Sequence, residues 1–200
     1  LEMGKLRDEQ TEIEKQLAEL DEFRELLYET GKPLEAAFRR AFSAFGLEVR
    51  SYVDGSDEFD IVFEHEGRHF IGECEGPADR AVDIKKCAQL MANMGRYAGV
   101  LGASVRGFLV GNGHRTRHPN ARENPFTDKC VQYASEANIL LIDSVSLFSG
   151  IQEMLALPAG DQQAFGEQCK RAILEGAGGP IRLPTTRPAT RRSLPADGNE

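Results

Sequence analysis

The chain has 200 residues, 40% of them hydrophobic, which suits one domain of ordinary size with appendages and enough apolar side chains to form a core. Of the net charge of −8, residues 1–30 contribute −6 through ten acidic and four basic residues, so the body is nearly neutral and cannot be held to nucleic acid by charge alone. No run of about 18 apolar residues exists and the four cysteines have no short paired spacing, which excludes a membrane-spanning helix, a disulfide framework and a zinc ribbon and favours a reduced, cytoplasmic setting.

Residues 1–30 predict a helical arm. Apolar side chains recur every seven residues or lie on the alternate seam of the same helix, although Gln10 and Arg24 interrupt it: Met3, Leu6, Ile13, Leu17, Leu20 and Leu27. Two interpretations remain open for residues 3–28. They form a coiled coil that pairs two copies or links to a missing N-terminal region, or they form one amphipathic helix packed on its own domain. The opening Leu-Glu-Met is typical of a fragment or a tagged chain, and a missing region could carry target recognition.

The next predicted elements are a helix and a strand. Pro33 suits the first turn of a helix that runs to Phe45 and is closed by Gly46, and a strand is expected at 47–53. Glu35 lies just off the apolar face of this helix. Its simplest role is that of a solvated side chain paired with Arg39 four residues later.

Residues 58–75 predict two strands joined by a tight Glu-Gly turn. With the turn centred there, Asp60 lies opposite Glu73 and Glu58 opposite Glu75, so four carboxylates share one face of the hairpin. Like charges directly opposite one another destabilise a strand pair. Hard oxygen ligands on a rigid hairpin suit Mg²⁺, so the pattern indicates either a cation site or a solvated acidic face.

A helix is expected from Asp83, a good N-cap, to Tyr97. Lys85 or Lys86, together with Gln89, either lies over the carboxylates or forms a solvated helix flank. The strand that follows, at 106–112, should run parallel to the preceding strand because a helix joins them.

Residues 113–124 predict a basic surface loop, in which Arg115, Arg117 and Arg122 are candidates to contact phosphate. Further elements are expected after it: a helix at 125–137, a strand at 139–142, and helices at 144–157 and 161–174. Together these describe an α/β domain at 31–175 with a mixed sheet flanked by helices, and a disordered tail at 176–200.

The element order and the acidic motif resemble the PD-(D/E)XK nuclease superfamily, which has the restriction-endonuclease-like fold. Asp60 and the triplet Glu73-Cys74-Glu75 match its motif, and Gln89 resembles the helix glutamine of several subfamilies. The resemblance covers residues 31–150. It implies that Asp60 and Glu73 hold Mg²⁺ or Mn²⁺, with Glu35 as an added ligand.

The sequence departs from that pattern at Glu75, where a lysine is usual, and at Phe59, where the pattern has proline. Lys85 or Lys86 could replace the missing lysine in space, or Glu75 could orient the attacking water. The resemblance implies a metal-dependent nuclease acting on nucleic acid, with DNA favoured. The alternative is a catalytically silent binding or scaffold module, dimerised or tethered through its arm.

Overall fold

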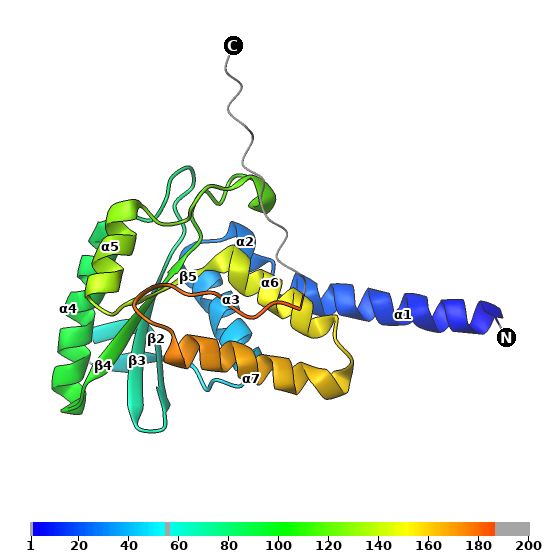
Figure 1. Cartoon of the computed structure of the whole chain (residues 1–200), viewed down its shortest axis with the longest axis horizontal. Coiled ribbons are helices and arrows are strands. Elements are labelled where there is room, and N and C mark those ends of the chain that lie inside the picture. The colour runs from blue at the N-terminus through cyan, green and yellow to red at the C-terminus, as the bar shows by residue number, and fades with distance from the viewer. Residues whose placement is uncertain (1, 55–56, 187–200) are drawn as a thin grey trace, which may run out of the picture.

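The computed structural model describes residues 2–54 and 57–186, and within them a six-stranded mixed sheet is covered by helices on both faces (Figure 1). The strand order is β1-β2-β3-β4-β5-β6, antiparallel from β1 to β3 and parallel from β3 to β6. The predicted α/β class with a mixed sheet is therefore confirmed. Among the described residues, no helix is both long and apolar enough to cross a bilayer.

The strands are β1 (Arg50–Asp54), β2 (Asp57–His65), β3 (Arg68–Glu75), β4 (Val105–Gly111), β5 (Leu140–Asp143) and β6 (Gly179–Pro180). The helices are α1 (Glu2–Asp21), α2 (Glu25–Tyr28), α3 (Gly31–Ala44), α4 (Ile84–Leu101), α5 (Asp128–Glu136), α6 (Ser144–Leu155) and α7 (Ala159–Glu175), with a short 3₁₀ turn η1 (Pro119–Ala121) in the loop after β4.

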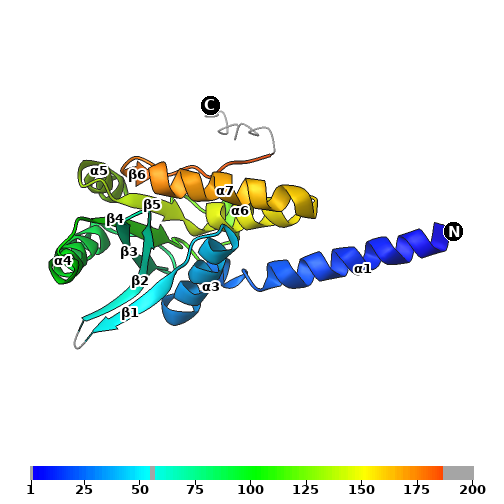
Figure 2. The same ribbon diagram turned by 90° about the horizontal axis from the view of Figure 1, so that it is seen from below.

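Two apolar clusters form the core, one on each face of the sheet. Alternate strand residues point to opposite faces, so Phe70 and Cys74 of β3 pack with α3, α6 and α7, whereas Ile71 packs with α4 and α5. Figure 2 shows these two helical layers on either side of the strands. The sheet therefore carries β3 between α3 and α4, the two helices on which candidate site residues were predicted.

The predicted hairpin register is confirmed where the strands pair. Val62 lies opposite Ile71, and the turn residues Glu66 and Gly67 both have positive φ, 51° and 75°. Two positive φ values in succession are the geometry of a type I′ turn, which matches the twist of the flanking strands. The α4 crossover makes β3 and β4 parallel, as expected.

The arm differs from the expected continuous helix over 3–28. The helix α1 ends at Asp21, a turn follows, and α2 begins at Glu25. Leu26 and Leu27 of α2 are buried in the body, whereas most of α1 extends away from it (Figures 1 and 2). The break occurs where the chain passes from solvent to the core.

The expected disorder from residue 176 onward is wrong for its first part. Gly179 and Pro180 form β6 and pair in parallel with Leu140 and Leu141 of β5. Ile181 and Leu183 also pack against the core. The backbone groups of β5 thus gain hydrogen-bond partners in β6. The sequence of this segment has no apolar periodicity and did not predict a strand there. Residues 187–200 of the predicted tail lie outside the described residues.

A close approach between β3 and β4 fixes the position of α3. A Cβ atom at Gly72 would lie 2.0 Å from the ring of Phe108, so only glycine leaves space for that ring. Phe108 in turn contacts Phe38 and Phe42 of α3, with ring centroids 5.6 and 5.7 Å away. This packing seats α3 on the sheet beside Asp60 and Glu73.

Candidate functional site

Glu73 lies near the end of β3 and is buried, with 6% of its surface exposed. Asn93 of α4 donates a hydrogen bond from Nδ2 to Glu73 Oε1 at 2.5 Å. Burial raises the pKa of Glu73, and the charges of Asp60 and Glu35 raise it further, while Lys86 and the Asn93 hydrogen bond lower it. The charges of Asp60, Glu35 and Lys86 therefore all affect the pKa of this carboxyl group.

Glu35 is not the solvated side chain that its helical position predicted. It is 7% exposed, and its Oε2 lies 4.0 Å from both Arg39 Nη1 and Lys32 Nζ. Glu35 lies on the side of α3 that packs toward the sheet, so its carboxylate is covered. The longer cationic side chains of Lys32 and Arg39 extend outward from this position. The predicted Arg39 neighbour is present, but as a distant ion pair to a buried carboxylate.

Asp60 lies at an irregularity of β2. Arg50 of β1 pairs with Val62 and Tyr52 pairs with Phe59, so β2 has one more residue than β1 between these pairs, as in a β-bulge. Phe59 accordingly packs on the α4 side of the sheet, although regular alternation would put it with Ile61 on the α3 side. Bulges re-aim side chains, and this one falls on Asp60.

The bulge corrects one detail of the predicted hairpin. Ladder pairing between β2 and β3 reaches only as far as Ile61–Gly72, so Asp60 and Glu73 are not a directly opposed pair. The predicted opposition of Glu58 and Glu75 involves a Glu58 side chain outside the described ones. Asp60 and Glu73 are nevertheless near enough for the charge of one to raise the pKa of the other.

Arg39 links Asp60 to α3. Its Nη1 donates to the carbonyl oxygen of Asp60 at 3.1 Å, and the same nitrogen lies 4.0 Å from Glu35 Oε2. Burial raises the pKa of the Cys74 thiol, and Asp60, Glu35 and Glu73, in that order, raise it further. The carboxylates of Glu35 on α3, Asp60 on β2 and Glu73 on β3 therefore all lie close enough to Cys74 to raise its pKa.

Lys86, rather than Lys85, reaches the carboxylates. Lys86 Nζ lies 3.0 Å from Glu75 Oε2, and its charge also lowers the pKa of Glu73. Lys85 and Gln89 are exposed on α4. Of the two lysines that the sequence left as alternatives, the structure brings one to the acidic cluster.

Asn93 is a site residue that sequence reasoning missed. It lies seven residues after Lys86, on the same side of α4, and is 4% exposed. A usable signal was present, because Asn93 falls three residues after Leu90 and four before Tyr97, both buried. An amide on a core-facing helical stripe needs a hydrogen-bond partner, and here that partner is Glu73.

A cavity of about 290 Å³ lies beside these residues, between the end of β3 and the start of α4. Its lining includes Glu75 and three cationic residues, Arg80, Lys85 and Lys86. Lys85, though exposed, therefore borders the same cavity as Glu75. Two acidic residues, Glu75 and Asp83, and these three cationic residues therefore line one cavity.

The predicted basic loop lies at the surface for most of its length, and hydrogen bonds tie it to the body of the domain. Arg115 donates from Nε to the Gly76 carbonyl at 2.8 Å, next to the end of β3. Arg117 is exposed, and its Nη1 lies 2.6 Å from Glu123 Oε1. A phosphate contact stays a prediction for both residues.

Arg122 has a structural role in the same loop. It is 7% exposed and donates to the side chain of Asn112 at 2.7 Å and to the carbonyl oxygens of Arg117 and Arg115, both at 3.0 Å, and also to the carbonyl of Leu27. Ser144 Oγ also donates to Asn112 Oδ1, at 3.0 Å. Arg122 therefore ties the loop to α2 and to Asn112, the residue after β4, and these bonds use four of the five N–H donors of the guanidinium group.

The acidic side chains of the site suit a metal ion with few protein ligands. Among the side chains that the structure describes, no three His, Cys, Asp or Glu side chains are grouped as ligands of one ion. Mg²⁺ in proteins is commonly held by one or two carboxylates, with waters and substrate phosphates completing its shell. Glu73 has a second carboxylate oxygen besides the one bonded to Asn93, and Asp60 lies nearby. These two carboxylates match that smaller requirement.

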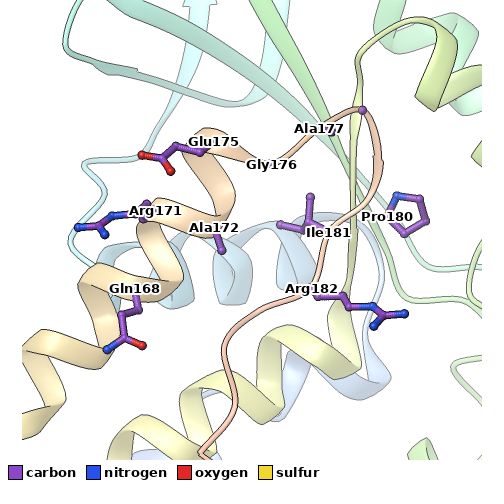
Figure 3. A pocket seen from close by; sticks show the side chains of 10 residues that line it. Gln168, Arg171, Ala172, Glu175, Gly176, Ala177, Pro180, Ile181 and Arg182 are labelled. Carbon is purple, nitrogen blue, oxygen red and sulfur yellow. The ribbon is translucent and has the colours of Figure 1, made fainter. Parts of the chain in front are cut away.

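A second cavity, of about 500 Å³, lies between α7 and the segment that carries β6 (Figure 3). Arg171, Glu175 and Arg182 are among its lining residues. None of the predicted site residues borders it, so it is separate from the acidic cluster.

Comparisons of the chain with protein-family models, curated proteins and solved structures find no match.

Proposed function

We propose that this chain contains a metal-dependent nuclease domain of the restriction-endonuclease-like fold, which hydrolyses phosphodiester bonds of nucleic acid, with DNA as the first candidate. One observation carries the proposal: Glu35, Asp60 and Glu73 come from three different elements, and their charges act together on the buried end of β3. Buried like charges are costly unless a positive charge offsets them. A divalent cation bound by these carboxylates would offset their negative charge and would also bind the phosphate of a substrate.

The topology supports the fold that the sequence resembles. An antiparallel β1-β2-β3 unit follows α3, and α4 crosses over to the parallel strands β4 and β5. The motif residues lie on β2 and β3, with Glu35 on the preceding helix and Lys86 on the following one. This order of elements and motif residues supports the proposed fold.

A divalent cation fits the donor chemistry of Glu73 and Asp60, with Glu35 as a further oxygen donor. Burial, and then the charges of Asp60 and Glu35, raise the pKa of Glu73, so a cation beside this carboxylate would stabilise its ionised form. When bound, Mg²⁺ or Mn²⁺ would polarise the phosphodiester and lower the pKa of an attacking water.

The remaining chemistry falls to the side chains of the chain itself. Lys86 lies beside both Glu73 and Glu75, so its ammonium group can stabilise negative charge on the phosphate without a lysine in the triplet. Glu75 accepts a hydrogen bond from the attacking water and orients it. Lys85 and Arg80, which line the adjacent cavity, hold the neighbouring phosphate of the backbone.

A silent nucleic-acid-binding module is the second candidate, and a specific observation favours it. Asn93 already binds Glu73, and Lys86 already binds Glu75, so these two acidic groups have partners within the protein. A site satisfied in this way could retain the fold and the cationic residues of the cavity without cleaving. The two candidates differ in their need for a divalent cation.

The experiment that separates them is titration of Mg²⁺ and Mn²⁺ into wild type and Asp60→Asn, with cleavage of supercoiled plasmid and single-stranded DNA measured on the same samples. We expect the wild type to bind metal and cleave, and Asp60→Asn to lose both while keeping its melting temperature. Asp128→Asn is the matched control, because Asp128 is an exposed aspartate in the first turn of α5.

Cleavage retained by Asp60→Asn would disprove the assignment of the metal site. DNA binding without metal binding or cleavage, in the wild type, would support the silent module instead. Absence of metal binding, DNA binding and cleavage would leave the carboxylates as a structural acidic cluster.

A further inference from the structure

The outer part of α1 carries an apolar stripe exposed to solvent. Met3, Leu6, Ile13 and Leu17 are 84, 62, 57 and 61% exposed, more than any other large hydrophobic side chain of the described residues. The helix extends away from the domain in both views (Figures 1 and 2). Of the apolar α1 side chains that the structure describes, only Leu20, at the inner end, packs against the core.

These exposures exclude one of the two interpretations of the arm. A helix packed on its own domain would bury the stripe, and the structure buries only its inner end. Most of the stability of helices in proteins comes from the packing of an apolar face rather than from intrinsic helix propensity. The stripe therefore needs a partner outside the domain.

The stripe has the spacing of a coiled-coil seam. Leu6, Ile13 and Leu20 are seven residues apart, and Met3 and Leu17 lie on the alternate seam position with Gln10 between them. A narrow seam at this spacing fits one other helix of the same kind. Every copy of the chain carries such a helix.

We propose that a second copy of this chain covers the stripe, with the two α1 helices antiparallel. Arg7 and Glu14 occupy equivalent flanking positions beside the seam, seven residues apart. In an antiparallel pair these positions face one another, so Arg7 of each copy meets Glu14 of the other, and symmetry makes the attraction occur twice. In a parallel pair, position 14 would instead meet position 9 of the partner copy, and both are glutamates.

The position of the domain at the inner end of α1 favours the same orientation. A parallel pair would set the inner ends of both helices side by side, so the two domains attached there would meet. An antiparallel pair sets the outer end of one helix against the inner end of the other. The two domains then lie at opposite ends of the helix pair and do not occupy the same space. The seam layers then match an apolar residue with an apolar residue, except at the centre: Met3 with Leu20, Leu6 with Leu17, and Gln10 with Ile13.

The proposal is tested by sedimentation equilibrium of the whole chain over about 1–100 µM, because dimer stability depends on protomer concentration. We expect a dimer, which Leu6→Glu and Leu17→Glu each weaken at least about tenfold, since each substitution removes two buried leucines from the interface. Ala18→Glu adds the same charge to an exposed position of α1 off the seam and should leave the dimer intact. A monomer at all these concentrations would overturn the proposal.

Orientation is tested by mixing two single variants, Leu6→Cys and Leu17→Cys, under mild oxidation. The four native cysteines are buried, so the introduced thiols should react first. We expect a covalent dimer in the mixture and little in either variant alone, with peptide mapping identifying position 6 joined to position 17. Self-linked dimers of each single variant would show a parallel pair and overturn the proposed arrangement.

A charge exchange gives a second test of orientation. Arg7→Glu and Glu14→Arg should each weaken the dimer, and the double variant should restore it, because the exchanged charges again meet their opposites. Failure of the double variant to recover affinity would contradict the antiparallel pairing even if a dimer forms.

Discussion

Lys86 Nζ lies 3.0 Å from Glu75 Oε2, joining the first turn of α4 to the last residue of β3. The sequence has a glutamate where the resembling nuclease pattern has a lysine, and this contact brings a lysine from the next helix beside that glutamate. The two side chains are each less than one third exposed, so the ammonium group is close to the carboxylates but still reachable by a substrate.

The first prediction concerns this lysine. Lys86→Ala should lower metal-dependent cleavage by about 10²–10³-fold, the loss typical when one group that stabilises developing charge is removed. Lys86→Arg should recover part of the rate because it keeps the charge. The measurement is kcat/KM at saturating metal.

Lys85→Ala is the comparison, since Lys85 borders the cavity but does not contact Glu75. It should weaken DNA binding modestly and leave kcat nearly unchanged. An ion pair as exposed as that of Lys86 and Glu75 contributes about 0–1 kcal/mol to stability, so neither variant should unfold. Equal rates for the two variants would refute the special role of Lys86.

The second prediction concerns stability. Because burial raises the pKa of Glu73, the folded protein holds this proton more tightly than the unfolded chain does. The resulting destabilisation is absent below the pKa of the unfolded chain and fully present above the raised pKa. Without metal, Glu73→Gln should therefore raise Tm at neutral pH by about 2–4 °C, the shift that roughly 1 kcal/mol gives in a domain of this size.

Thermal melts of both proteins across pH check this sign. The advantage of Glu73→Gln should shrink as the pH falls toward about 4, where an unfolded glutamate takes up its proton. Mg²⁺ should raise the Tm of the wild type and have no such effect on the variant. A variant less stable than the wild type at neutral pH would show that the charge at Glu73 is well compensated.

The third prediction is a shift in the pH profile of cleavage. The hydrogen bond from Asn93 lowers the pKa of Glu73, so Asn93→Ala should raise that pKa further. Cation binding needs the ionised carboxylate, and the acid limb of the activity profile should therefore move to higher pH in the variant. Met91→Ala, an exposed residue of the same helix, should leave the limb in place. An unshifted limb would mean that Glu73 does not control the acid loss of activity.

Local patterns predicted the scaffold of the site well. Alternation and the Glu-Gly turn gave the hairpin register from Val62 to His65, and Asp83 does cap α4, accepting a hydrogen bond from the backbone N–H of Lys85. These features depend on residues near one another in the chain, where turn and cap geometry follow directly from residue type. The parallel pairing of β3 with β4 followed from the intervening helix.

What the patterns missed depends on tertiary packing. The burial of Glu35 results from the seating of α3 on Phe108, and the bulge at Asp60 appears only when β2 is paired with β1. Whether Lys85 or Lys86 reaches Glu75 depends on the rotation of α4 about its axis, which the core contacts of Cys87 and Leu90 set. Helical periodicity fixes such a rotation only approximately, and neighbouring residues on a helix point about 100° apart.

The last prediction separates structure from binding in the basic loop. Arg122→Ala would remove the Arg122 donor from the carbonyl oxygen of Leu27 and leave Asn112 Oδ1 with only the bond from Ser144, so it should destabilise the protein by roughly 2–4 kcal/mol. Arg117→Ala, at an exposed position, should leave Tm nearly unchanged. If Arg117 contacts phosphate, its variant should bind DNA more weakly and reduce the slope of log affinity against log salt by about one.

Thermal denaturation and DNA binding at several salt concentrations measure both effects on the same two proteins. Arg122→Lys provides a further comparison, because one ammonium group cannot serve four acceptors on different segments of the chain. It should recover little of the lost stability. A stable Arg122→Ala variant with weakened DNA binding would reverse the assignment and return Arg122 to the phosphate-binding role that its sequence position suggested.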